Sequence, residues 1–267
     1  MNEFRLDPES LSFTLVSKEP TKCKACDKKS EKLASFPFRK GYVNVYDIKD
    51  DVQPSKFELT GERFKSSNAD GYEEITVENQ EHGDNLRTYS TEEIEHLLWF
   101  LCERKRVLNK YNFGENMVII RHLDQHGYFD TLLLHVPTQK VPGSRCTECE
   151  NVNNTNDREV YKTENFVLYV PFAPKYGGEV IISPRKHLAF EDCDSVVLFD
   201  LAGVLKRLLE KQPQETTIAI VQMADRHFKV KLFHGAVDAY SVLGINRIDR
   251  SPEDISKELR AKMSNGT

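Results

Sequence analysis

The sequence predicts an α+β fold built from two similar halves, and three observations support this. A Cys-x-x-Cys pair occurs twice, at Cys23–Cys26 and at Cys146–Cys149. After each pair comes a β-like run that leads to a histidine, then one amphipathic helix, then two further β-like runs. The second of these runs again ends in a histidine in both copies. The repeat therefore divides the chain into halves at 1–145 and 146–267.

The bulk composition is that of an ordinary folded chain. Of its 267 residues, 39% are hydrophobic and 30% are charged, which is the composition of a folded rather than a disordered protein. The net charge is 37 − 42 = −5, so no global electrostatic attraction draws the chain to nucleic acid or anionic membranes. The N-terminus, MNEFRLDPES, lacks the parts of a secretory signal, and no apolar run is long enough to span a bilayer. We expect an intracellular, cytoplasmic protein whose thiols stay reduced.

In the first half, the β-like segment is GYEEITVENQEH, Gly71 to His82. Ser90 with Glu93 three residues later is a capping box and predicts the start of a helix. Apolar residues at helical spacing then mark one face of that helix: Ile94, Leu97, Leu98 and Leu101. The runs NMVIIRHL and YFDTLLLH follow, and the second ends at His135.

The second half repeats this order. The segment GGEVIISPRKH leads to His187, and leucines at helical spacing predict a helix from about Ser195 to Lys211. The runs TTIAIVQM and HFKVKLFH follow, and the second ends at His234. The polar stretch Asn151 to Glu159 is typical of a linker or loop. Ser251 and Pro252 predict a short C-terminal helix.

Cysteine pairs in a reducing compartment favour metal binding, and zinc prefers four tetrahedral ligands from thiolate and imidazole. Each half offers one Cys-x-x-Cys pair and two strand-end histidines. We therefore predict two zinc ions per chain, each held in a closed, structural site. The predicted ligand sets are Cys23, Cys26, His82 and His135 in the first half, and Cys146, Cys149, His187 and His234 in the second.

Other interpretations of these residues stay open. One zinc ion held by all four cysteines would satisfy both pairs at once, although the recurrence of the histidines argues against it. A single Cys-x-x-Cys can also be a redox pair. The remaining histidines are interpreted as surface or core groups, namely His96, His122, His126 and His227. Cys102 and Cys193 are interpreted as small, partly buried thiols.

The residues resemble the galactose-1-phosphate uridylyltransferases of the histidine-triad superfamily over nearly the whole chain. EFRLDPESLSFTLVS looks like the family's opening strand pair, and VLYVPFAPKYGGEVIISPRKHLAFED is similar to the start of its second half. The stretches ITVENQEHGDNLRTYSTEEIEHLL and KLFHGAVDAY with GINRIDRSPEDISKELR look like other family segments. The resemblance implies tandem histidine-triad-like halves with antiparallel sheets and flanking helices, structural zinc, and often a homodimer.

Active members of the family carry the motif His-Pro-His-x-Gln, and its second histidine attacks the α-phosphate of a nucleotide sugar. The matching stretch here is His135-Val136-Pro137-Thr138-Gln139. Pro137 therefore stands where the resemblance places the attacking histidine, and the proline side chain contains no nucleophilic group. The preceding loop has one glycine, and Ala236 stands where members often have a second histidine.

Two hypotheses for function follow. The first is an inactive member with no catalytic residue, which acts as a binding or assembly factor for a protein or nucleotide. The second is an active nucleotidyltransferase or phosphorylase on nucleotide sugars, in which His122 or His126 replaces the missing nucleophile. A nucleic-acid-binding zinc protein is a weaker hypothesis, because the spacings do not match a compact finger. The basic residues at Lys22–Lys29 and Arg104–Arg106 are then solvated faces.

Overall fold

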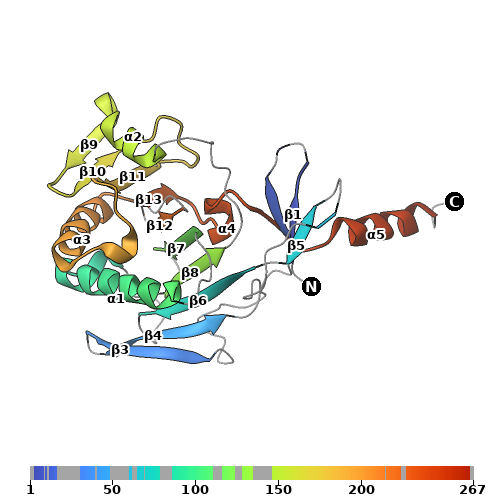
Figure 1. The fold of residues 1–267 in the computed structure, drawn as a ribbon, viewed down its shortest axis with the longest axis horizontal. Coiled ribbons are helices and arrows are strands. Elements are labelled where there is room, and N and C mark those ends of the chain that lie inside the picture. Colours follow the sequence, from blue (N-terminus) through green and yellow to red (C-terminus); the bar gives the residue numbers. More distant parts are fainter. Residues whose placement is uncertain are drawn as a thin grey trace.

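A ten-stranded antiparallel sheet forms the body of the molecule (Figure 1). The computed structural model describes residues 3–8, 10, 12–16, 31–39, 41–48, 60–61, 65–68, 70–78, 86–110, 116–123, 128–134, 146–213, 215–223 and 227–264. The strand order is β3-β4-β6-β8-β7-β12-β13-β11-β10-β9. The strands are β3 Lys32–Phe38, β4 Gly41–Ile48, β6 Gly71–Val77, β7 Asn116–His122, β8 Tyr128–Leu134, β9 Glu159–Lys162, β10 Phe166–Tyr169, β11 Val180–Pro184, β12 Thr216–Gln222 and β13 Phe228–His234.

The strand order is symmetric about the central pair of β7 and β12. Outward from the centre, the first half runs β7-β8-β6-β4-β3 and the second runs β12-β13-β11-β10-β9. The two halves meet through antiparallel pairing in which Ile119 lies opposite Ile220. The predicted α+β fold of similar halves with antiparallel strands is confirmed. The division at residue 145 stays a prediction, because the sheet runs unbroken from one half to the other.

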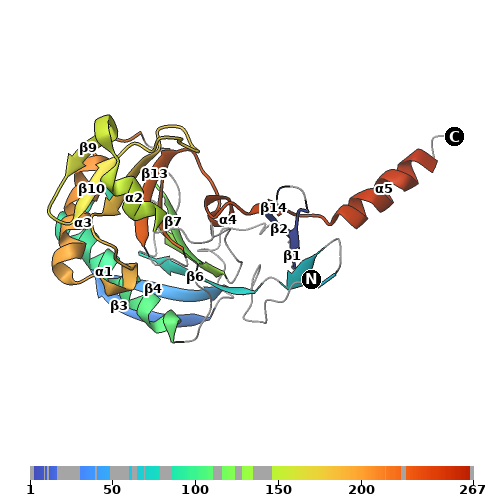
Figure 2. The same cartoon turned by 45° about the horizontal axis from the view of Figure 1, so that its top comes forward.

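One long helix from each half covers the same face of the sheet. They are α1, Thr91–Asn109, and α3, Ser195–Leu209, and they lie side by side (Figures 1 and 2). The predicted capping box is present at the start of α1, where Ser90 accepts from the Glu93 amide and Glu93 accepts from the Ser90 amide. The predicted apolar positions of α1 are buried against the sheet and α3: Ile94, Leu97, Leu98 and Leu101.

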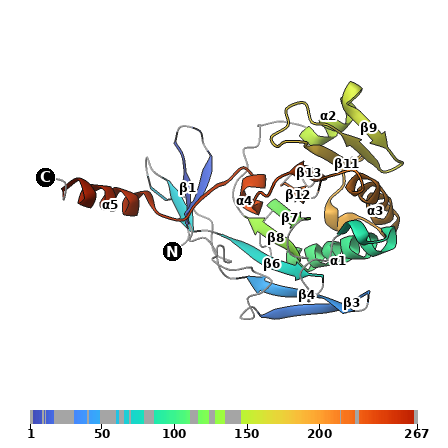
Figure 3. The ribbon, with the colours of Figure 1, turned by 180° about the vertical axis from the view of Figure 1, so that it is seen from behind.

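A small four-stranded sheet lies beside the body, in the order β14-β2-β1-β5. Its strands are β1 Glu3–Leu6, β2 Phe13–Val16, β5 Ser66–Asn68 and β14 Asn246–Ile248. Strands β1 and β2 form the expected opening pair, and Phe4 and Leu15 join the buried cluster on the second face of the main sheet. Helix α4, Ala239–Val242, packs there too. Helix α5, Pro252–Ser264, leads away to the C-terminus (Figure 3).

The stretch Asn151 to Glu159 is not the loop that its polar composition predicts. It contains the end of helix α2, Thr147–Asn153, and a 3-10 turn, η3, Asn156–Arg158. Asn153 and Asn154 explain the difference, because their side-chain amides donate to the carbonyls of residues four positions earlier, at 2.9 and 2.7 Å. Two further 3-10 turns are η2, Leu86–Thr88, and η4, Phe190–Asp192. None of the described helices combines the length and apolar character needed to cross a bilayer.

Candidate metal centre

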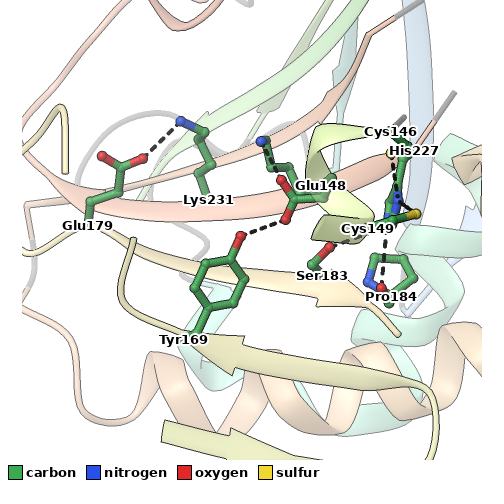
Figure 4. A network of polar contacts seen from close by, with 10 residues as sticks. Cys146, Glu148, Cys149, Tyr169, Glu179, Ser183, Pro184, His227 and Lys231 are labelled. Atoms are coloured by element: carbon green, nitrogen blue, oxygen red, sulfur yellow. Dashed lines mark hydrogen bonds and ion pairs between the residues drawn. The ribbon is translucent and has the colours of Figure 1, made fainter. Parts of the chain in front are cut away.

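The second Cys-x-x-Cys pair lies at the start of α2. Cys146 is the residue that precedes the first turn, and Cys149 is in that turn. One helical turn separates the two positions, so both sulfurs face the same side. Figure 4 shows both cysteines beside His227.

Two histidines reach the cysteines from neighbouring strands. His187 follows the end of β11, and His227 stands immediately before β13. Strands β11 and β13 pair antiparallel, with Ile182 opposite Val230, so the end of one lies beside the start of the other. The two imidazole rings meet edge to face with centroids 5.2 Å apart. The pairing of β11 with β13 therefore brings both imidazole rings to the same end of the strand pair.

The four side chains form a compact donor set. Their ligand atoms all lie within 4.8 Å of one another. The Nδ1 atom of His227 is 3.3 Å from the sulfur of Cys146 and 3.2 Å from that of Cys149, and His187 Nδ1 is 3.5 Å from Cys149. In a tetrahedral zinc site with bonds of about 2.3 Å to sulfur and 2.0 Å to nitrogen, sulfur and nitrogen are about 3.5 Å apart. Two thiolates and two imidazoles at these distances fit zinc.

The surroundings of His227 fix which ring nitrogen is available. Its Nε2 atom lies 3.3 Å from the carbonyl of Pro184 and 3.4 Å from the Ser183 hydroxyl. A carbonyl only accepts, so Nε2 carries the proton and donates it to Pro184. Nδ1 then presents a lone pair to the sulfurs, which is the form that binds a metal. His227 is 3% exposed, so this orientation is held by packing.

Glu148, between the two cysteines, ties α2 to the sheet. Its carboxylate accepts from the Tyr169 hydroxyl at 2.6 Å and from Lys229 at 2.7 Å (Figure 4). Burial opposes ionisation of this carboxyl, but the charge of Lys229 and the hydrogen bonds from Lys229, Tyr169 and Ser183 together outweigh it and lower the pKa of Glu148. Burial, with the charge of Glu148 beside it, raises the pKa of Tyr169. Lys231 makes a second ion pair on the same strand, with Glu179.

Comparisons with known proteins agree with this architecture. No family model matches the chain. The chain is 25% identical to a galactose-1-phosphate uridylyltransferase of Thermotoga maritima, in a match that covers 71% of this chain and 68% of that protein. A solved uridylyltransferase structure matches at a TM-score of 0.66 and 22% identity, over 98% of this chain and 99% of that one. An ADP-glucose phosphorylase from Arabidopsis thaliana, with bound ADP-glucose, matches at 0.59 and 18%, over 96% and 98%.

The chain is similar in sequence to a galactose-1-phosphate uridylyltransferase and has the fold of a solved uridylyltransferase. The relation rests on the sequence match to the Thermotoga protein and on a fold shared along almost the whole chain. The residues quoted for the resemblance include the opening strand pair, β1 and β2, and the first part of α1.

The structure corrects one predicted ligand in this uridylyltransferase-like chain. His234 ends β13, at the opposite end from His227, and its ring packs over Gly178 at the start of β11. Seven residues of extended strand separate the two histidines by roughly 20 Å. Cys146, Cys149 and His187 lie together as predicted, but His227 takes the fourth place instead of His234. The strand pairing of the second half is the signal that identifies His227.

The other predicted ligand set lies outside the described residues. It comprises Cys23, Cys26, His82 and His135, so a first-half zinc site, and the count of two ions, stay predictions. The stretch from His135 to Gln139, with Pro137, lies outside them as well. Two of the remaining histidines make other contacts: His96 meets the ring of Phe36, and His122 Nδ1 lies 2.8 Å from the Thr217 hydroxyl.

The remaining thiols and the Arg104–Arg106 cluster have structural roles. Cys102 and Cys193 are buried, and burial raises the pKa of the Cys102 thiol to about 11. Arg104 makes a two-pronged ion pair with the fully buried Glu74. Arg106 donates to the carbonyl of Glu191 at 2.6 Å. These arginines join α1 to neighbouring elements, so the prediction that they form a solvated face is wrong.

Proposed function

We propose that this chain is a zinc-stabilised, uridylyltransferase-like binding protein that does not transfer nucleotides by the family's route. The observation that carries the zinc-dependent part is the closed donor set of Cys146, Cys149, His187 and His227. Four protein ligands leave no open position for water or substrate, so a zinc ion held there stabilises the fold and does not activate water. The metal would join α2 to the ends of β11 and β13.

The proposed loss of nucleotide transfer rests on Pro137. The family's reaction needs an imidazole that attacks phosphorus and carries the nucleotide as a covalent intermediate. Pro137 stands at that position in the resemblance and offers neither a nucleophile nor a backbone N–H. A protein of this fold that lacks the attacking group can still bind a nucleotide or a protein partner. We propose that this binding is its role.

A labelling experiment tests the proposal. The purified zinc-loaded chain is incubated with UDP-glucose and ADP-glucose that carry ³²P in the α-phosphate, and protein-bound label is measured after denaturation. The Thermotoga relative serves as positive control. We expect no labelled histidine in this chain, together with a rise in melting temperature with at least one nucleotide or nucleotide sugar. A stable nucleotidyl–histidine would overturn the inactive assignment.

One observation favours the second candidate, an active nucleotidyltransferase. In the second half, His227 stands immediately before β13; in the first half, His126 stands two residues before β8, the corresponding strand. His126 precedes this strand in the sequence and is therefore the candidate for a relocated nucleophile. If labelling succeeds, His126→Ala should abolish it. His122→Ala is the matched control, because His122 is already engaged with Thr217. Label that survives in both variants would exclude both residues.

A further inference from the structure

The four free cysteines in the described part of the chain fall into two pairs with opposite surroundings. Cys102 and Cys193 are buried, with exposed fractions of 0% and 2%. The Cys102 sulfur lies 3.2 Å from the carbonyl of Phe190, to which a thiol donates only while it keeps its proton. Burial raises the pKa of both thiols, so they stay protonated at neutral pH, and a protonated thiol is a poor nucleophile.

Cys146 and Cys149, in the metal centre, have the opposite character. Both are partly exposed and His187 beside them is exposed, whereas His227 closes the inner side of the centre. Small molecules in the solvent can therefore reach the two sulfurs. Zinc binds cysteine as thiolate, which is also the form that peroxides oxidise. A zinc-loaded centre thus presents two reactive sulfurs, while the thiols of Cys102 and Cys193 are shielded.

The geometry of Cys146 and Cys149 permits a disulfide between them. Their sulfurs belong to a set of ligand atoms that all lie within 4.8 Å of one another, and both cysteines stand beside the same ring in Figure 4. A disulfide needs about 2.05 Å between the sulfurs. Cys146 precedes the first turn of α2, and its backbone, with φ of −55° and ψ of 113°, is not helical. Rotation of its side chain toward Cys149 can therefore close the gap without unwinding the helix.

Glu148 holds α2 on the sheet without any metal. Its buried carboxylate accepts from the Tyr169 hydroxyl of β10 and from Lys229 of β13. Neither contact involves a metal ligand, so both persist when the sulfurs leave the metal. An oxidised cysteine pair therefore remains beside His187 and His227. Reduction then returns the sulfurs to the place where the four ligands meet.

We propose that Cys146 and Cys149 are a modification site, at which hydrogen peroxide or an organic hydroperoxide oxidises the pair to a disulfide and the metal is released. The inference rests on the proposed zinc centre and adds regulation to it. In the reduced state zinc ties α2 to the ends of β11 and β13. In the oxidised state the Glu148 contacts hold α2 without that tie, so the helix becomes looser while the sheet stays intact.

The oxidation balances in two steps. The thiolate of one cysteine attacks an oxygen of the peroxide, so that a sulfur–oxygen bond forms, the oxygen–oxygen bond breaks and hydroxide leaves. The second thiolate attacks this sulfur, which forms the sulfur–sulfur bond and expels the other oxygen as hydroxide. Two protons from the solvent convert both hydroxides to water. The sulfurs lose two electrons, which the peroxide gains, and the disulfide no longer offers the thiolates that bind zinc.

The test exposes the full zinc-loaded chain to a small molar excess of hydrogen peroxide. Released zinc is measured by the colour of its complex with 4-(2-pyridylazo)resorcinol, and sulfur chemistry by mass spectrometry of tryptic peptides. Trypsin cleaves after Arg145 and Arg158, so Cys146 and Cys149 share the peptide 146–158, which a disulfide makes lighter by two hydrogen atoms. Cys102 and Cys193 fall on two other peptides.

We expect this centre to release its zinc ion as the peptide 146–158 becomes oxidised. Its oxidation should be at least about tenfold faster than that of either buried thiol. Amide hydrogen exchange should speed up in α2 and not in the central strands. Dithiothreitol with added zinc should restore the peptide mass, the bound zinc and the slow exchange.

Two variants serve as controls. A Cys146→Ser, Cys149→Ser double variant reports any zinc that peroxide releases from elsewhere in the chain, and it should release one ion fewer. Cys102→Ser removes a buried thiol and should respond like the unaltered chain. Equal zinc release by the double variant and the unaltered chain would overturn the proposal.

The metal content before peroxide is added separates this inference from the proposed function. Zinc that depends on Cys146 and Cys149, together with a peptide 146–158 that peroxide leaves reduced, would overturn the switch and leave the zinc-stabilised fold standing. Zinc that does not depend on these cysteines would contradict the proposed zinc centre itself, and the switch with it.

Discussion

His227 and His234 stand at opposite ends of one strand, and that separation decides which of them lies beside the cysteine pair. His234 donates its backbone N–H to Gly177, at the beginning of β11. The cysteines lie at the other end of the same strand pair, beside His227. The sequence repeat selects His234, because His135 ends the corresponding run of the first half. Only the direction in which β11 and β13 pair distinguishes them.

Substitution of each histidine tests this assignment. His227→Ala should lose one equivalent of zinc per chain, because it removes a buried ligand from a four-ligand set. His234→Ala is the matched control and should keep all its zinc. Metal content is measured by mass spectrometry after gel filtration. Loss of zinc from His234→Ala, with none from His227→Ala, would restore the assignment made from sequence.

Glu179 gives a second prediction at the residue scale. Its carboxylate accepts from the Lys175 and Tyr176 amides at 2.6 and 3.2 Å and from Lys231 at 2.8 Å. Burial opposes its ionisation, but the bond and charge of Lys231 prevail and lower the pKa of Glu179. A lowered folded-state pKa means that stability is full above the ordinary glutamate value, about 4.3, and is lost as the pH falls through the lowered value.

We therefore expect Glu179→Gln to cost about 2 kcal/mol of unfolding free energy at neutral pH. The difference from the unaltered chain should shrink as the pH falls below about 4, where Glu179 becomes protonated. Urea unfolding at a series of pH values measures both effects. Glu210→Gln, at an exposed position after α3, is the control. A cost that is the same at pH 3 and pH 7 would contradict this account.

At the scale of elements, the start of α1 shows how local sequence fixes a helix. Ser90 and Glu93 satisfy each other's backbone amides. Ser90→Ala should lower the unfolding free energy by about 1 kcal/mol. For a chain of this size that is a fall in melting temperature of about 2–4 °C, measured by calorimetry. Ser195→Ala, at the first residue of α3 where Asp194 is the cap, should change little. Equal losses of stability in both variants would contradict a stabilising role of the capping box.

The elements that could be predicted from sequence are those whose signals are local. The capping box and the leucine spacings locate α1 and α3, and the apolar runs locate β7, β8, β12 and β13. Helix α2 is not predicted, because its seven residues are mostly polar and carry no periodic signal, and its last turn depends on the side chains of Asn153 and Asn154. His227 was missed because strand pairing is a long-range property. In an antiparallel pair the end of one strand lies beside the start of the other. A prediction that β11 and β13 pair in this way would have favoured His227 as the partner of His187.

At the scale of the whole molecule, the metal centre links segments that are distant in sequence: the start of α2, the end of β11 and the start of β13. Removal of the metal should therefore loosen α2 while the ten-stranded sheet persists. We expect a chelator to lower the melting temperature by several degrees and to speed amide exchange in α2, with little change in circular dichroism. A Cys146→Ser, Cys149→Ser double variant should not respond in this way. A chelator effect of the same size in that variant would assign the metal to another site.

The pairing of β7 with β12 has a consequence for any attempt to split the chain. All seven residues of β12 are buried, so both faces of this strand are shielded from solvent. A fragment that begins at Cys146 lacks β7, so β12 would become an edge strand whose backbone groups on that side have no partner strand. Identical edges can pair antiparallel about a twofold axis. Such a fragment should form a homodimer in which one copy replaces the missing half of the other, and light scattering would detect it.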